Sequence, residues 1–390
     1  MNVRQIIRKS LHMMLVAALL TSCDMMKEDR DDCPTGLYVN FVYDYNIQRA
    51  DMFKDHVGAV TLYVFDEADR LVAQRTVSGS ELKAYGYNIH FTEQELAPGH
   101  QYRLTAVALQ KNWDEALANR GAKYHKTTLS KGDSRQQVSV SLDRTPTGKP
   151  NYYEVPMDNA PLDTLWHTQQ LMTATAATQP TATRYHENAS GEPTTNAIQT
   201  VTVESGIPTY ATVSLIRDTN HLNLSLFELD PNSTDGFKDA DAEDYEVFII
   251  DANGDVDSDN RLTNTADTLL YRPYAQWNTP INEMGAAEPK RSAHYDLMFN
   301  RLMYHDTLDD NALLCIRRKS DQKEVAVINL PYYLCIGRTA YEIYSYQPQE
   351  YLDREYDYRL ELFIRGDRWA YISICIDVLS WAKRIQYVDF

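Results

Sequence analysis

Alternating carboxylates between residues 251 and 259 are the sequence feature closest to a metal site. The segment carries an oxygen-bearing side chain at every second position: Asp251, Asn253, Asp255, Asp257 and Asp259. Calcium takes six to eight oxygen ligands at about 2.3–2.6 Å, and such a run can supply several of them. However, the glycine comes too early for an EF-hand loop, and no glutamate follows at the twelfth position. Because Asn-Gly after a strand is typical of a hairpin, the segment predicts a turn, with a calcium site as the alternative.

Local motifs for catalysis or nucleotide binding do not occur in the sequence. The ten histidines form no HExxH pair, no serine stands in GxSxG, and neither GxxxxGK[ST] nor GxGxxG is found. The sequence also has no CxxC pair that would hold a structural zinc ion. We therefore expect a protein that is not an enzyme and that has no cofactor.

Cys23 is the residue whose chemistry the sequence predicts most specifically. Leu20-Thr21-Ser22-Cys23 resembles a bacterial lipobox, in which small residues precede the cysteine and a leucine stands three positions upstream. This resemblance implies cleavage between Ser22 and Cys23 and the transfer of diacylglycerol to the thiol. Each buried methylene contributes about 0.8 kcal/mol, so two or three acyl chains hold a protein firmly in a membrane. A plain secretory signal with an accidental cysteine is the alternative.

The segment before Cys23 has the order of a secretory signal peptide. Three cations precede an apolar run at residues 11–20, which is about half of the ~20 residues that a membrane-spanning helix needs. Residues 1–22 are therefore expected to be removed. Residues 23–33 are polar and acidic, which predicts a disordered tether, and Lys27-Glu28-Asp29 resembles the export tag of surface lipoproteins in Bacteroidetes. We expect a lipid-anchored protein of the cell outer membrane that is exposed at the surface, with an inward-facing lipoprotein as the alternative.

The charge of the chain makes nucleic acid an unexpected partner. The formal net charge is −17, and it becomes −20 when the signal peptide with its three cations is removed. Phosphate binding needs clustered lysine and arginine, which such a balance does not favour. The mature chain of about 365 residues is long enough for two or three domains with cores of their own.

Four cysteines besides Cys23 permit disulfide bonds in an exported protein. They are Cys33, Cys315, Cys335 and Cys375. Cys315 and Cys375 lie in apolar, strand-like runs, where a free cysteine behaves as a small hydrophobic residue. The sequence therefore leaves both the disulfide and the free thiol open.

Apolar and polar residues alternate along most of the chain, which is the pattern of half-buried strands. Strands are expected at residues 37–45, 60–65, 102–109, 138–142, 211–216, 222–226, 245–250, 312–316, 325–330, 358–364 and 372–376, and a short helical turn at 112–118. Between about 172 and 196 the composition changes to small and polar residues, which predicts a long surface loop. Two runs of strands on either side of it predict an all-β protein with two sandwich domains, at residues 34–200 and 201–390.

The 27 tyrosines suggest a second class of function, namely glycan binding. Aromatic rings present an apolar face and a polar tip, which suits stacking on sugars. The densest cluster comprises Tyr332, Tyr333, Tyr341, Tyr344, Tyr346, Tyr351, Tyr356 and Tyr358. Because tyrosine also favours strands, a packing role for this cluster is the alternative.

Several segments resemble, in order, the Mfa2/FimB family of fimbrial minor subunits of Bacteroidetes. Residues 33–46, which begin Cys-Pro-Thr-Gly-Leu-Tyr-Val-Asn-Phe, are similar to the start of the mature domain, and residues 57–66 to its second strand. Leu165-Trp166-His167 is similar to a segment that closes the first domain, and residues 213–222 to the opening strands of the second. The resemblance covers most of residues 23–380.

This resemblance implies two tandem transthyretin-like β-sandwich domains, an outer-membrane lipid anchor and a place at the base of a fimbria, with the shaft subunit as partner. Polymerising subunits of related fimbriae are joined by strand exchange, in which an extended segment pairs with an open sheet edge. The terminal segment 381–390 is suited to be a donor strand, and an ordinary last strand is the alternative. Its candidate residues are Trp381, Ile385, Tyr387, Val388 and Phe390. A host or bacterial surface ligand is a further expected partner if the protein acts in adhesion.

Overall fold

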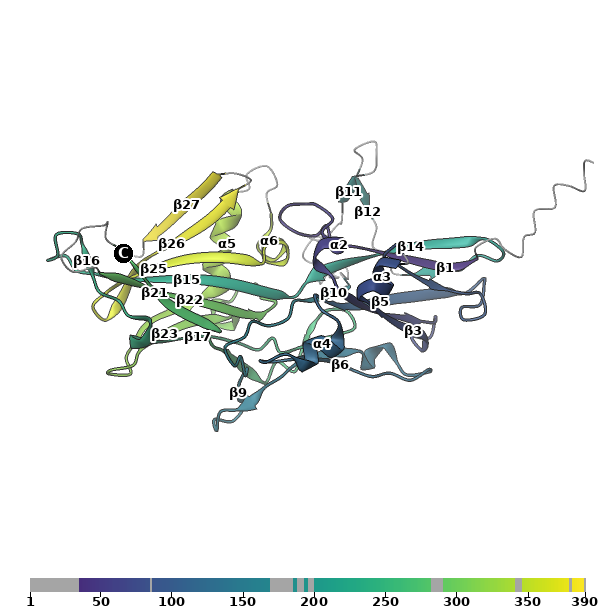
Figure 1. The fold of residues 1–390 in the computed structure, drawn as a ribbon, viewed down its shortest axis with the longest axis horizontal. Coiled ribbons are helices and arrows are strands. Elements are labelled where there is room, and N and C mark those ends of the chain that lie inside the picture. Colours follow the sequence, from purple (N-terminus) through teal and green to yellow (C-terminus); the bar gives the residue numbers. More distant parts are fainter. Residues whose placement is uncertain are drawn as a thin grey trace, which may run out of the picture.

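The computed structural model describes residues 35–168, 185–187, 193–195, 200–281, 290–340, 346–378 and 381–388, except residue 85. Strands dominate these ranges and the helices are short, so the predicted all-β class is confirmed. Two sandwich-like lobes lie end to end along the long axis of the molecule (Figure 1).

The first lobe and a smaller layer beside it account for most of the first half of the chain. The strands of the first lobe are β1 (Gly36–Val42), β2 (Ala59–Phe65), β3 (Leu71–Ser78), β4 (Asn88–Phe91), β5 (Gln101–Leu109), β10 (Leu165–Thr168), β13 (Val201–Thr202) and β14 (Pro208–Arg217). The smaller layer contains β6 (Tyr124–Lys126), β7 (Ser139–Leu142), β18 (Asp255–Asp257) and β19 (Leu262–Thr263). The short helices here are α2 (Phe53–His56), α3 (Gly79–Ala84), α4 (Trp113–Ala118) and η2 (Arg135–Gln137).

The second lobe contains the remaining long strands. They are β8 (Thr145–Pro146), β9 (Tyr152–Glu154), β15 (Thr219–Leu229), β16 (Phe237–Lys238), β17 (Tyr245–Asp251), β20 (Thr268–Tyr271), β21 (Ala275–Pro280), β22 (Arg291–Asn300), β23 (Leu313–Arg318), β24 (Glu324–Asn329), β25 (Asp357–Arg365), β26 (Arg368–Val378) and β27 (Trp381–Val388). Its helices are η3 (Ala242–Asp244), η4 (Leu308–Asp310), α5 (Leu330–Ile336), η5 (Gly337–Ala340) and α6 (Pro348–Arg354). Within the predicted loop, the described pieces β11 (Tyr185–Glu187) and β12 (Pro193–Thr195) pair with each other.

The sheet of the first lobe folds over its own core. Its order is β3-β2-β5-β10-β14-β1-β4, with β13 attached to β5. The alternation predicted for the first strand places Leu37 and Val39 inside, where they share a cluster with Leu62 and Leu104 of the opposite strands. Strand β1 runs parallel to β14, from Gly36 opposite Pro208 onward. This parallel pair joins segments that are far apart in the sequence.

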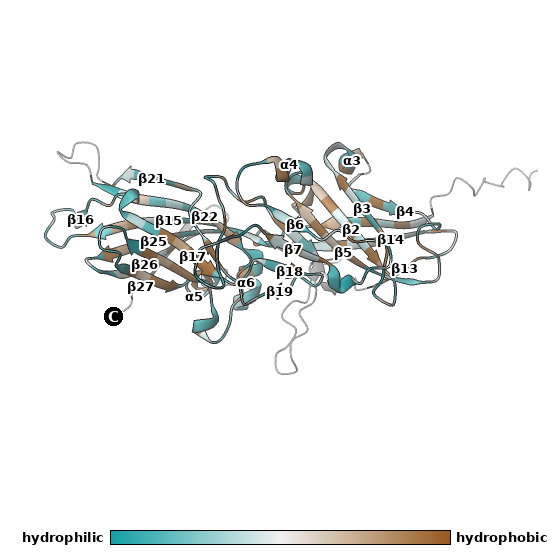
Figure 2. Ribbon diagram, turned by 90° about the horizontal axis from the view of Figure 1, so that it is seen from below, coloured by the Kyte–Doolittle hydropathy of each residue, from teal (hydrophilic) through white to brown (hydrophobic). Residues whose placement is uncertain are grey.

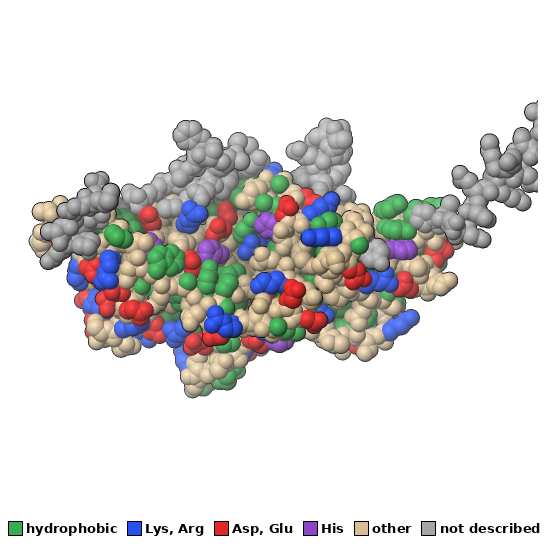
Figure 3. Space-filling model, viewed as in Figure 1, with side chains coloured by type: hydrophobic (Ala, Val, Ile, Leu, Met, Phe, Trp, Pro, Cys, Tyr) green, Lys and Arg blue, Asp and Glu red, His purple; other side chains and the backbone are tan. Residues whose placement is uncertain are grey.

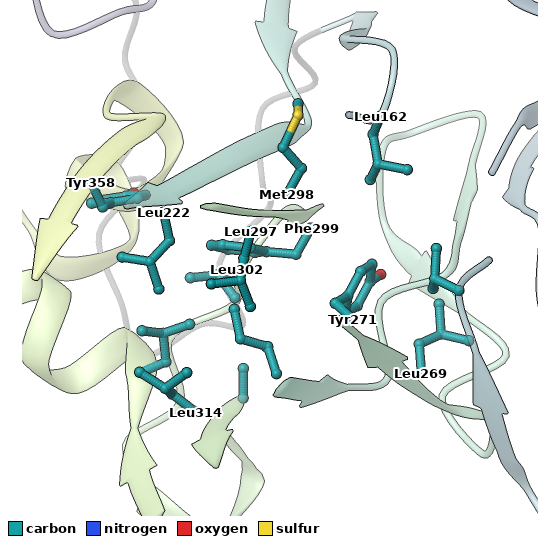
Figure 4. Close-up of a cluster of buried hydrophobic side chains, with 14 of the residues drawn as sticks. Leu162, Leu222, Leu269, Tyr271, Leu297, Met298, Phe299, Leu302, Leu314 and Tyr358 are labelled. Atoms are coloured by element: carbon teal, nitrogen blue, oxygen red, sulfur yellow. The ribbon is translucent and has the colours of Figure 1, made fainter. Parts of the chain in front are cut away.

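The second lobe packs two sheets face to face. One has the order β21-β22-β15-β25-β26-β27, with β16 attached to β15, and the other has the order β24-β23-β17-β20-β9-β8. Side chains of both sheets meet in one cluster, including Leu222, Leu297 and Leu314 (Figure 4). Helices α5 and α6 add Leu334 and Leu352 to it. Figure 2 shows apolar residues concentrated along the strands of both lobes.

The two lobes exchange strands and share one core. Strands β8 and β9, from the first half of the chain, extend a sheet of the second lobe, whereas β18 and β19 return to pair beside β7. Strand β14 completes the first sheet by pairing with β1, and only Asp218 separates it from β15. Sheet membership therefore changes at residue 218, because the parallel partner β1, which is far away in the sequence, holds β14 in the first sheet.

The central position of β15 makes Leu224 a test of the second core. Leu224 is fully buried. Its truncation leaves a cavity between the two sheets that the surrounding side chains fill only in part. We expect Leu224→Ala to lower the free energy of unfolding by about 2–5 kcal/mol. The matched control is Val327→Ala in β24, where the side chain is 46% exposed and the expected loss is below about 0.5 kcal/mol. Urea unfolding measures both, and equal losses would contradict the assignment of this core.

Candidate functional site

The predicted lipidation residue Cys23 and the predicted cleavage site between Ser22 and Cys23 lie outside the described residues. What the structure describes is where the chain enters the fold. Strand β1 begins at Gly36, at one end of the long axis, and β27 lies in the lobe at the other end (Figure 1). Among the described residues, no helix is long and apolar enough to cross a membrane.

The predicted donor segment forms β27, which pairs with β26 of the same chain. The register runs antiparallel from Tyr371 opposite Val388 to Val378 opposite Trp381. Strand β27 has β26 as its only neighbour among the described residues and is therefore an edge strand of its sheet. In this chain the segment is an ordinary last strand, and donation to another protein stays a prediction. Phe390 lies outside the described residues.

The segment 251–259 is not the hairpin that Asn253-Gly254 predicts. Strand β17 pairs with β20 and β23, whereas β18 pairs with β7 and β19, so the two flanking strands belong to different sheets. Neither Asn253 nor Gly254 has the positive φ that a type I′ turn requires. A Cβ at Gly254 would lie 2.6 Å from Leu269 Cδ1. The glycine thus permits a close crossing between sheets instead of a turn.

The carboxylates of this segment have partners within the protein. Asp255 forms an ion pair with Arg144, and Asp259 with Arg135 at 2.5 Å. Asp257 accepts backbone hydrogen bonds from the turn that follows it. Within the described ranges, His, Cys, Asp and Glu side chains form no group of three that could hold a metal ion. A calcium ion would have to displace these arginines.

Asp218, the single residue between β14 and β15, is the centre of a buried polar junction between the lobes. Its backbone N–H donates to Leu165 O at 2.8 Å, and its Oδ1 accepts from Asn260 Nδ2 at 2.8 Å. Asp218 is 1% exposed, and burial raises the pKa of its carboxyl to about 7. Asp218 Oδ2 and Asn260 Oδ1 are both buried without a hydrogen-bond partner. A proton on Asp218 would supply the donor that this pair of acceptors lacks.

A buried ion pair of the second lobe forms another part of the same junction. Arg301, directly after β22, donates through Nε and Nη2 to the carboxylate of Asp353 in α6, both at 2.8 Å. Its Nη1 donates to Asn260 O at 2.8 Å. Burial lowers the pKa of Arg301, but the Asp353 carboxylate outweighs burial and holds this pKa above its usual range. Arg301 therefore stays charged and binds both Asp353 and the backbone beside Asp218.

Hydrogen bonds from the first lobe complete this junction. The hydroxyl of Tyr124 in β6 lies 3.1 Å from Thr219 Oγ1 and donates to Asn300 Oδ1. Leu165 N donates to Thr219 Oγ1 at 3.0 Å. Sequence patterns did not indicate these residues, because their only signal is a short polar stretch between two strands. The junction therefore fixes the lobes through groups that lie far apart in the chain.

The remaining predicted features are part of the core. Cys315 and Cys335 are free and buried, and burial raises their thiol pKa values to about 11 and about 12. Cys33 and the side chain of Cys375 lie outside the described residues. Within the predicted tyrosine cluster, four members are buried: Tyr333, Tyr346, Tyr351 and Tyr358. Packing, not an exposed sugar platform, explains those four positions.

In the part of the chain that the structure describes, two β-sandwiches share a core, and β27 lies at the edge of one sheet. The sequence model described as "Fimbrillin-A associated anchor proteins Mfa1 and Mfa2" matches residues 30–387. The chain belongs to this family of fimbrial anchor proteins, as its sequence predicted. No curated protein sequence matches the chain significantly.

Solved structures share this fold over nearly the whole chain. A candidate polysaccharide-binding protein from Bacteroides thetaiotaomicron is 25% identical, with a TM-score of 0.62 over 90% of this chain and 99% of that chain. A candidate adhesin from the same species is 24% identical, with a TM-score of 0.63 over 90% and 98%. The fimbrial anchor protein Mfa2 from Porphyromonas gingivalis is 16% identical, with a TM-score of 0.53 over 92% and 100%.

Replacing the carboxyl of Asp218 should change how stability depends on pH. A carboxyl whose pKa is about 7 in the folded state and 3.8 in the unfolded chain stabilises the fold below about pH 4, and this contribution is lost as the pH rises toward 7. Asp218→Asn keeps the shape and cannot titrate. Between pH 5 and pH 7 the free energy of unfolding of the original protein should therefore fall by about 2 kcal/mol more than that of the variant.

Denaturant titrations at the two pH values measure this difference. Other buried groups with shifted pKa values, such as Asp251 and His167, are common to both proteins, so their contributions cancel. Parallel pH dependences would show that Asp218 is ionised in the folded protein.

Proposed function

We propose that this chain is an outer-membrane lipoprotein that serves as the anchor or accessory subunit of a fimbria. Acyl chains on Cys23 hold it in the membrane, and backbone pairing at a sheet edge holds the shaft subunit. The observation that carries the proposal is the family match over residues 30–387, together with the lipobox at residues 20–23. No catalytic residue is needed for this role.

The strand pairing provides a continuous path for tension between the two ends. Load that enters β1 passes through its ladder with β14 to the single residue Asp218, and from there to β15. Strand β15 pairs in parallel with β25, which is linked through β26 to β27. The shared core and the buried junction oppose separation of the lobes along this path. Such a path suits a protein that links a membrane to a fibre.

The edge at β27 supports two modes of assembly. If β27 stays on β26, its outer edge offers unpaired N–H and C=O groups to a strand from the shaft subunit. If β27 leaves, it becomes the donor, and the edge of β26 becomes available for pairing. Both modes place the shaft contact in the lobe opposite the lipid tether.

Glycan binding is a second candidate function. The 25% identical relative from Bacteroides thetaiotaomicron is described as a candidate polysaccharide-binding protein. A glycan array probed with residues 24–390, which lack the lipidated cysteine, tests this function. A signal in the absence of any association with fimbrial shafts would favour it over the anchor function.

Replacing the lipidated cysteine tests the membrane anchor. Cys23→Ala removes the thiol that would receive the lipid, so metabolic labelling with palmitate should disappear and the protein should leave the membrane fraction. Cys33→Ala is the matched control, since it removes a nearby cysteine outside the lipobox, and labelling should persist. A Cys23→Ala protein that stays labelled and membrane-bound would refute the lipid anchor.

Removing residues 381–390 tests the assembly edge. Without β27, neither mode of pairing has its strand, so co-purification with the shaft subunit should be lost while palmitate labelling persists. Unchanged co-purification would rule out both modes at β27.

Loss of folding must be separated from loss of pairing in this test. Thermal unfolding of the truncated protein shows whether the second lobe persists. A synthetic peptide of residues 381–390, added in excess to the full chain during assembly, provides a second arm. It should reduce shaft association by competing for the same edge, and it leaves the chain itself intact.

A further inference from the structure

A row of aromatic rings crosses three neighbouring strands at the start of the first lobe, half-buried at Tyr38 and His90 and exposed at Tyr210. Tyr38 of β1 lies in register with Tyr210 of β14 and with His90 of β4. Because Leu37 and Val39 point into the core, the rings of this row lie on the outer face of the sheet. The Tyr38 ring stacks on His90 at 4.1 Å between centroids and lies 5.5 Å from the Tyr210 ring.

Tyr210 and Ile207 are the most exposed of the large hydrophobic residues in the described part of the chain. They are 65% and 54% exposed. Figure 3 shows hydrophobic side chains gathered at this end of the molecule, with a histidine beside them. We name Tyr38, His90, Ile207 and Tyr210 the β1 patch. His90 is held in place because its Nε2 donates to Thr35 O at 2.8 Å, so the row is a preformed surface.

The charges around the β1 patch do not favour an anionic ligand. Arg75 is paired with Glu95 at 2.6 Å. The carboxylate of Glu93 accepts a hydrogen bond from Gly206 N at 2.7 Å, directly before Ile207. The whole chain is acidic as well, with a formal net charge of −17. A surface that is apolar, aromatic and free of excess cations suits a neutral, amphipathic environment.

The position of the β1 patch in the chain indicates which environment this is. Twelve residues, 24–35, separate Cys23 from the start of β1, and such a length spans at most about 45 Å when fully extended. Tyr38 follows Gly36 by only two residues. A lipid on Cys23 therefore keeps this end of the molecule close to the bilayer, while β27 lies in the other lobe.

We propose that the β1 patch rests on the interfacial region of the membrane that holds the acyl chains, and so orients the protein with its second lobe outward. This inference rests on the proposed lipid anchor. Tyrosine is enriched where membranes meet water, because its ring is apolar and its hydroxyl is hydrated. A weak contact is sufficient, since the tether makes it intramolecular and raises the effective concentration of lipid at the patch.

Fluorescence quenching by lipid tests this contact without relying on lipidation. A protein of residues 24–390, which lacks Cys23, carries a histidine tag at its N-terminus and is attached to phosphatidylcholine vesicles that contain a nickel-chelating lipid. Tyr210→Trp places a fluorophore in the patch, and the unsubstituted protein supplies the background. Brominated phosphatidylcholine should reduce the added fluorescence at least about twofold. Leu308→Trp is the matched control, since Leu308 is 50% exposed in the second lobe, and its added signal should not change.

Three results would overturn the proposal. The first is an unquenched Tyr210→Trp signal, or equal quenching at both positions. The second is quenching that requires anionic lipid and disappears in high salt, which would indicate charge attraction. The third is a Tyr210→Trp fluorescence that brominated lipid does not change but that a soluble polysaccharide does change. This result would indicate that the patch binds sugar. Palmitate labelling that fails while quenching succeeds would refute the lipid anchor alone, so the two failures are distinguishable.

Discussion

The direct step from β14 to β15 through the single buried residue Asp218 is the constraint on which the structure depends. With only Asp218 between β14 and β15, there is no linker to absorb relative motion of the lobes. The residues around it must accommodate the hydrogen-bonding groups of a buried carboxyl, a buried amide and the Arg301–Asp353 ion pair in one place. Breaking such a pair is costly because it leaves an uncompensated charge. The junction therefore holds the two sandwiches in one orientation.

Much of the fold could be predicted because its signal is local. Alternation every two residues identified strands such as 102–109 and 245–250, and these correspond to β5 and β17. Asn112, the first residue of the predicted helical turn, accepts a hydrogen bond from Asp114 N and caps α4. Pairing between distant strands has no comparable signal. The parallel alignment of β1 with β14 and the return of β18 to β7 depend on the whole fold, so neither could be predicted from local patterns.

The same distinction explains the candidate sites. A lipobox is read as a linear peptide, so Cys23 could be singled out from four consecutive residues. The structure of Asn253-Gly254 depends instead on partners elsewhere in the chain. The Asn253 amide donates to Asn300 O and Arg301 O. The side chain of Leu269 lies so close to Gly254 that only glycine fits there. Tyrosine clusters are ambiguous for the same reason. Tyr358 is buried whereas Tyr210 is exposed, although both stand in alternating segments.

The two ends of the molecule differ in the chemistry that they offer. At one end, stacked rings provide side-chain surface, and at the other, β27 provides unpaired backbone groups. An open edge invites pairing between identical copies. The net charge of −17 opposes this, because like charges keep copies apart while leaving a neutral or basic partner free to approach.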